Sequence, residues 1–202
     1  MFFFKRKASV TKVEEVDLQN VGVFIKDPDR LLQMQIIGLN MEDLQLIRTL
    51  KPHVEVRILE VVQAFYSTIE SVPQFRETIT KNSSSERLRQ TLRHHVVEML
   101  EGRIDEKYLE NRRKVSLMHV RIGLSTKWYL AAFQKLEASL RNVVYSLNYH
   151  SEQKQKMIDA IGRICNFEQQ LVLEEYELVS AAIQQQQQQE VKEEVKSIVG
   201  DI

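Results

Sequence analysis

Residues 116–129 read Ser-Leu-Met-His-Val-Arg-Ile-Gly-Leu-Ser-Thr-Lys-Trp-Tyr, and they set one histidine in an apolar helical environment beside two large aromatic rings. Val115, Met118 and Ile122 accompany His119 at helical spacing. A neutral imidazole in such surroundings can bind ferrous heme iron if its second nitrogen is hydrogen-bonded and water is excluded. A lone histidine on an apolar helix face can also be a satisfied core residue, so the spacing alone leaves both interpretations open.

The composition favours a single all-α domain. The chain has 202 residues with only six glycines and three prolines, and helix-forming residues are abundant. Its 28 basic and 28 acidic residues give zero formal charge, so no global field attracts a nucleic-acid backbone, and no nucleic-acid partner is expected. The single Cys165 cannot form an internal disulfide, which favours a reducing, cytoplasmic location.

The hydrophobic pattern divides the chain into three parts. Residues 1–28 lack sustained periodicity and are expected to form an N-terminal leader without a secretion signal. Residues 29–183 carry the helical pattern of one domain. Residues 184–202 begin with six glutamines and continue with Val191, Val195, Ile198 and Ile202 at heptad steps, which predicts a linker or the start of a coiled coil. No stretch approaches the roughly 20 apolar residues that span a bilayer, so no transmembrane segment is expected.

Apolar spacing predicts a series of helices within the domain. One short helix should begin near Asp29, and a second should begin near Asn40 and end near Lys51-Pro52. A single apolar stripe should then run through residues 53–71. Further helices are expected at 73–79, 87–101, 105–120, 126–149 and from 151 beyond 183. Apolar residues spread around most of the last helix, which predicts a second buried face and therefore a partner. These residues are Met157, Ile158, Ile161, Ile164, Cys165, Phe167, Leu171, Val172 and Leu173.

Three blocks of this sequence resemble the sensor domain of globin-coupled sensors, most closely the heme-based aerotactic transducers. The blocks are residues 63–66 (QAFY), 87–95 (RLRQTLRHH) and 119–129 (HVRIGLSTKWY), and residues 167–174 (FEQQLVLE) extend the likeness over about 30–183. The resemblance implies an all-α globin fold of the sensor-globin variant with an extra N-terminal helix. It also implies a cytoplasmic heme b domain that forms a homodimer through two long helices, about 126–149 and 151–183.

The resemblance also implies roles for individual residues. His119 would be the proximal iron ligand, and Tyr66 and Thr91 would be the distal polar residues near a bound gas. Tyr66 could instead be a core tyrosine, and Thr91 could bond back to its own helix. His95 could contact a heme propionate, or it could offer a rival iron ligand, as His94 could. Phe65, Leu88 and Leu92 would line the distal pocket, and Trp128 and Tyr129 the proximal side.

The function implied is that of an oxygen sensor rather than an enzyme. The domain would bind O2 at ferrous heme iron, with CO and NO as further candidate ligands, and would regulate a C-terminal signalling module, in cis or in trans, that serves aerotaxis. A hydroxyl donor favours O2 over CO because bound O2 carries partial negative charge. Three alternatives remain: the sensor domain of a nucleotide cyclase, a heme-free interaction domain in stress signalling, and a globin that oxidises nitric oxide or peroxide. No reductase domain or nucleotide-binding glycine motif accompanies the last, so its turnover would depend on external electrons. The sequence also shows no nucleophile triad or phosphate loop.

Overall fold

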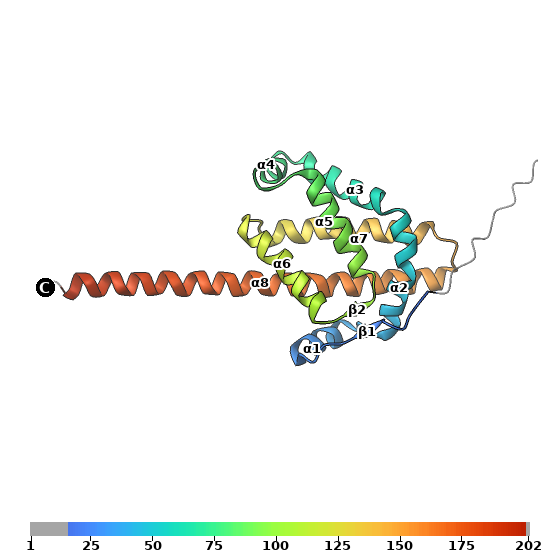
Figure 1. The fold of residues 1–202 in the computed structure, drawn as a ribbon, viewed down its shortest axis with the longest axis horizontal. Helices are drawn as coiled ribbons and strands as arrows, with labels where there is room; N and C mark the ends of the chain where they lie inside the picture. Colours follow the sequence, from blue (N-terminus) through green and yellow to red (C-terminus); the bar gives the residue numbers. More distant parts are fainter. Residues whose placement is uncertain (1–15, 201–202) are drawn as a thin grey trace, which may run out of the picture.

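The computed structural model describes residues 16–200, and in this part of the chain eight helices and two very short strands form one bundle (Figure 1). The all-α prediction is confirmed. The predicted leader is described only from residue 16, and Ile202 of the predicted heptad pattern also lies outside the described residues. Within 16–200, no helix combines the length and the apolar character needed to cross a membrane. The elements are β1 (Gly22–Val23), α1 (Pro28–Ile37), α2 (Met41–Val56), α3 (Ile58–Ser71), α4 (Pro73–Asn82), α5 (Ser85–Met99), β2 (Arg103–Ile104), α6 (Glu106–Arg121), α7 (Thr126–Ser146) and α8 (Ser151–Gly200).

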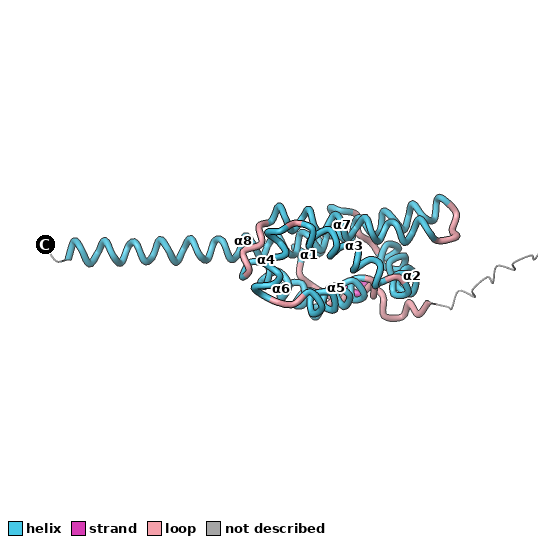
Figure 2. Tube along the Cα trace, turned by 90° about the horizontal axis from the view of Figure 1, so that it is seen from above, coloured by secondary structure: helices cyan, strands magenta, loops and turns pink. Residues whose placement is uncertain are grey.

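The long helix α8 is the centre of the bundle. Its first part packs against α6, α7, α2 and α1, while its second part continues alone past the body of the domain (Figure 1). The view from above shows the same extension (Figure 2). On the other side of the bundle, α3 packs against α7, α5 and α4. As a result α5 is held mainly by α3, whereas α6, which carries His119, is held mainly by α8.

Side-chain caps fix where the helices near the predicted site begin. The Ser84 hydroxyl accepts from the backbone N–H of Arg87 at 3.3 Å and starts α5. The Asp105 carboxylate accepts from the backbone N–H of Tyr108 at 2.9 Å and starts α6. Each cap of this kind contributes about 1 kcal/mol. The starting points of α5 and α6, the helix that carries His119, are therefore set by residues close in sequence.

A short parallel strand pair joins the segment before α1 to the connection between α5 and α6. Gly22 pairs with Arg103 and Val23 with Ile104. Next to this pair Gly102 has φ of +65°, and a Cβ there would lie 2.4 Å from the carbonyl oxygen of Leu44. Only glycine fits this position, and the turn that leads into α6 is therefore pressed against α2.

The predicted end of the second helix near Lys51-Pro52 is wrong. α2 continues through Pro52 to Val56, although proline cannot donate the backbone hydrogen bond expected inside a helix. Residues on both sides of the proline, Leu50 and Val54, are fully buried, and this burial offsets the lost bond. The single stripe predicted for residues 53–71 is accordingly divided at Arg57, where α2 ends and α3 begins.

The predicted second buried face of the last helix is explained by the domain itself. α8 is surrounded by four helices of the same chain, so apolar residues around most of its circumference are buried without a partner. Only Leu173 of the nine residues named above is not fully buried. The apolar excess of α8 is therefore no argument for dimerisation.

Candidate functional site

His119 lies in the last turn of α6, with one ring nitrogen enclosed by protein. Its Nδ1 atom is buried and has no hydrogen-bond partner among the residues that the structure describes, so the hydrogen bond that the sequence interpretation requires of the second ring nitrogen is not found at this atom. The Tyr129 ring of α7 lies 5.5 Å from the imidazole, centre to centre, and Phe133 lies 5.6 Å beyond Tyr129. Burial, with a smaller contribution from the neighbouring His95, lowers the pKa of His119 to about 4. The imidazole is therefore neutral at physiological pH, which is the form that binds a metal.

Tyr66 on α3 is a buried tyrosine with a free hydroxyl. Its side chain contacts the Phe65 ring edge-on at 5.1 Å, and the Arg89 guanidinium lies 4.9 Å from the centre of its ring. Within residues 16–200 the Tyr66 hydroxyl makes no hydrogen bond to protein. Burial is the main cause that raises the pKa of Tyr66 to about 12, while Arg89 opposes the shift. The hydroxyl thus keeps its proton and can donate it in a hydrogen bond.

The other distal candidate, Thr91 on α5, is arranged differently. Thr91 is exposed, and its hydroxyl donates to the carbonyl oxygen of Arg87 one turn earlier at 3.0 Å. This is the bond back to its own helix that the sequence left open. Leu88 and Leu92, which flank it, are half-buried against the core. Of the two candidate donors, the hydroxyl of Tyr66 is free and that of Thr91 is engaged.

Trp128 and Tyr129 have different surroundings. Tyr129 is buried and contacts His119 directly, as described above. Trp128 is 40% exposed, and its indole ring packs edge-on against Phe75 of α4 at 5.5 Å. The structure thus brings Tyr129 to the histidine and Trp128 to α4.

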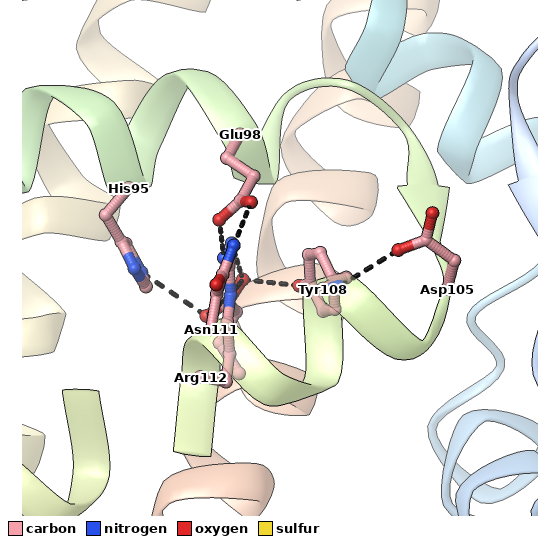
Figure 3. Close-up of polar contacts among 7 residues, drawn as sticks. His95, Glu98, Asp105, Tyr108, Asn111 and Arg112 are labelled. Atoms are coloured by element: carbon pink, nitrogen blue, oxygen red, sulfur yellow. Dashed lines mark hydrogen bonds and ion pairs between the residues drawn. The ribbon is translucent and has the colours of Figure 1, made fainter. Parts of the chain in front are cut away.

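His95 belongs to a cluster of buried polar side chains, hereafter the Arg112–Glu168 cluster. It links α5 (His95, Glu98), α6 (Tyr108, Asn111, Arg112) and α8 (Glu168), and most of its contacts appear in Figure 3. The Arg112 Nε atom donates to both carboxylate oxygens of Glu168, at 2.8 and 2.9 Å, and the Tyr108 hydroxyl donates to the same carboxylate. Arg112 also pairs with Glu98. His95 Nε2 lies 3.3 Å from Glu168 Oε2, whereas His94 is exposed.

Charge pairing inside this cluster outweighs the cost of burial. Burial alone would raise the pKa of Glu168, but Arg112 and then His95 hold that pKa well below its ordinary value. Glu168 and Arg112 are both about 1% exposed, so neither charge is shared with solvent. The His95 ring is thus already paired with a carboxylate of α8 through its Nε2 atom.

Sequence reasoning missed Arg112 and Glu168, although a signal was present. Glu168 interrupts the apolar run of the last helix between Phe167 and Leu171, and Arg112 precedes His119 by seven residues, on the same helix face. A charged residue at such a position implies a buried partner. Spacing could not show which residue that partner is.

The residues at His119 fit a metal that brings most of its own ligands. Among residues 16–200 no group of three or more His, Cys, Asp or Glu side chains could hold a metal ion. The iron of heme carries most of its ligands with it and needs only one from the protein. A neutral imidazole, the Tyr129 ring beside it and a free hydroxyl on α3 suit such a group.

Comparison with known proteins places the fold. The model of the Protoglobin family matches residues 28–181. The globin domain of a globin-coupled sensor from Geobacter sulfurreducens is similar with a TM-score of 0.68 and 20% sequence identity, over 72% of this chain and 96% of that chain. Two crystal forms of the globin domain of E. coli DosC, ferric and ferrous, have TM-scores of 0.60 and 0.61 at 17% and 15% identity. They match over 72% of this chain and 97% and 98% of theirs. The predicted globin fold is therefore confirmed.

Proposed function

Because the chain belongs to the Protoglobin family, we propose that it binds heme b through His119 and senses diatomic gases, O2 first among them. The observation that carries the proposal is His119 itself. It is a neutral, half-buried imidazole with an unpartnered buried Nδ1 nitrogen, in a region that offers no other set of metal ligands within residues 16–200. A histidine kept only for the core would be expected to satisfy its buried nitrogen.

Heme, when bound, would supply a ferrous iron that takes up O2, CO or NO. The chain would supply the rest. His119 would hold the iron from the proximal side, and Tyr129 with Phe133 would keep water from the imidazole. Phe65, Leu88 and Leu92 would give the distal side an apolar lining.

The distal donor in this proposal is Tyr66 rather than Thr91. The Tyr66 hydroxyl is protonated and free, so donating to a polar ligand costs it no existing bond to protein. Thr91 would first have to give up its bond to the Arg87 carbonyl. One ordinary hydrogen bond contributes about 0.5–1.5 kcal/mol, or up to roughly tenfold in affinity, which would favour O2 over CO.

The ligation state would be passed to a signalling module, in cis or in trans, and aerotaxis is the process we favour. The domain would act in the cytoplasm as a homodimer through α7 and α8. Support for association comes from the part of α8 beyond the domain body, where several apolar side chains are exposed. These are Leu178, Ile183, Val191 and Val195. The sensor domain of a nucleotide cyclase remains the alternative within the same chemistry.

The test is the visible absorption spectrum of purified, heme-supplemented protein, reduced under nitrogen and then exposed to O2. We expect a five-coordinate ferrous spectrum that converts reversibly to a stable oxygenated one. His119→Ala should lose the five-coordinate heme, whereas the control His94→Ala, which changes an exposed histidine, should keep it. Unchanged heme affinity and spectrum in His119→Ala would reassign the ligand. A protein that takes up no heme would instead favour the heme-free interaction domain.

A further inference from the structure

The helix that carries His119 is joined to α8 by an ion pair between the exposed Arg113 side chain and Glu175, at 3.0 Å, and by two further connections on either side of the histidine. The first is the Arg112–Glu168 cluster, seven residues before His119. The second lies just after the histidine: the backbone N–H of Leu124 donates to the carbonyl oxygen of His119 at 3.0 Å. The Tyr176 hydroxyl of α8 donates to the carbonyl oxygen of Leu124 at 2.7 Å. Two hydrogen bonds in series thus connect the His119 backbone to α8.

The two connections differ in how readily they give way. The cluster holds fully buried opposite charges, and a shift there would leave Arg112 or Glu168 uncompensated in the interior, which is strongly unfavourable. The Tyr176 connection is a single neutral hydrogen bond, and Tyr176 is half-buried. Seven helical residues span about 10 Å, so α6 has a fixed point near Arg112 and a lighter contact beyond His119.

The other contact of His119, with Tyr129, reaches α8 less directly, since burial and then the electrostatic influence of Glu168, Cys165 and Tyr176 of that helix raise the pKa of Tyr129. The Tyr129 ring touches the imidazole, but Tyr129 belongs to α7, which ends at Ser146 within the body of the domain. Tyr176 belongs to the helix that continues beyond the body (Figure 1). Burial raises the pKa of Tyr176 to about 12, so its hydroxyl remains a donor.

We propose that Tyr176 is a positioning residue that transmits movement of His119 to α8 through the Leu124 carbonyl, with the Arg112–Glu168 cluster as the fixed point of α6. The proposal rests on the function proposed above and specifies how that site is read out. Displacement of His119 on gas binding would swing the end of α6 about the cluster. The Leu124–Tyr176 hydrogen bond would then shift α8 around residue 176.

The test compares Tyr176→Phe with the matched control Tyr145→Phe, which changes an exposed tyrosine of α7. Heme-supplemented protein is followed by hydrogen–deuterium exchange in peptides covering 119–126 and 171–183, in the ferrous state with and without CO. Before any gas is added, Tyr176→Phe should speed exchange in 119–126 about two- to tenfold, the effect of losing one neutral hydrogen bond. This first comparison does not depend on bound heme.

On adding CO, wild-type protein and Tyr145→Phe should change their exchange in 171–183, and Tyr176→Phe should lose that change. Heme content and the CO dissociation rate, read from the Soret band, should stay within about twofold of wild type, since Tyr176 is not assigned to the gas site. A full CO-dependent change in Tyr176→Phe would overturn the proposal, as would an equal loss in Tyr145→Phe. Absence of any change in heme-loaded wild type would overturn it too. A missing Soret band would refute the proposed function instead, and with it the proposed coupling of gas binding to α8 through Tyr176.

Discussion

Replacing Glu168 by glutamine should reveal how strongly the buried charges hold the three helices together. Glu168 is fully buried and accepts from Arg112 and Tyr108, while Arg112 is 1% exposed. Breaking a buried ion pair costs about 3–5 kcal/mol because the other charge is left unpaired in the interior. Glutamine keeps one acceptor oxygen for Tyr108, and Glu98 still faces Arg112. We therefore expect a loss near the lower bound, about 3 kcal/mol of unfolding free energy.

The assay is urea unfolding followed by circular dichroism at pH 7, with all proteins at equal heme content because bound heme adds stability by mass action. A loss of about 3 kcal/mol corresponds to a melting temperature lower by roughly 6–12 °C for a domain of this size. Glu174→Gln is the matched control, since it changes a carboxylate on the same helix whose pair with Arg30 is only partly buried. Such pairs contribute about 0–1 kcal/mol. A loss in Glu168→Gln below 1 kcal/mol, or no larger than in Glu174→Gln, would refute the reasoning.

Three further predictions follow from the same structure. Tyr66→Phe should speed O2 dissociation by up to roughly tenfold and change CO dissociation less, whereas Thr91→Ala should alter O2 dissociation by no more than about twofold, because its hydroxyl is already hydrogen-bonded. Stopped-flow mixing measures both rates, and a larger effect of Thr91→Ala would make Thr91 the donor. Gly102→Ala should lower the unfolding free energy by more than about 2–3 kcal/mol, because its Cβ would lie 2.4 Å from the Leu44 carbonyl oxygen. The control Gly123→Ala, with φ of +70° but nothing within 4 Å, should lower it by only about 1 kcal/mol, and equal losses would contradict the clash. The difference in unfolding free energy between wild type and Glu168→Gln should be full at pH 7 and shrink as the pH falls below about 4.5, because the pKa of the Glu168 carboxyl is lower in the folded than in the unfolded chain. A constant difference down to pH 3 in urea titrations would exclude Glu168 as a source of acid sensitivity.

The fold was largely predictable from local pattern, because helix starts, apolar faces and caps depend on residues close in sequence. The limits of that approach appear at Pro52, where burial of Leu50 and Val54 overrides the usual meaning of a proline. They appear again in α8, whose apolar circumference indicates burial but does not say by which chain. Only the packed structure shows that α6, α7, α2 and α1 account for it.

The candidate site was predictable in part. His119 and Tyr66 were identified from sequence blocks, and the structure gives His119 a neutral, half-buried ring and Tyr66 a free hydroxyl. The engaged hydroxyl of Thr91 depends on a side-chain rotamer, which sequence does not specify. The pairing of Arg112 with Glu168 joins residues 56 positions apart, and no local pattern encodes such a partnership.

Because α8 is one continuous helix of 50 residues, its length determines the direction in which its later side chains point. The first part of α8 is packed in the core, and no proline follows Pro73. The rotation of the exposed part about the helix axis, and its position along that axis, are therefore set by the packed part. One residue inserted among Gln184–Gln189 would turn everything beyond it by about 100° and advance it by about 1.5 Å, while seven would restore nearly the original angle. The glutamine run is helical, so the number of residues in it fixes both the rotation and the distance of the following segment relative to the globin body.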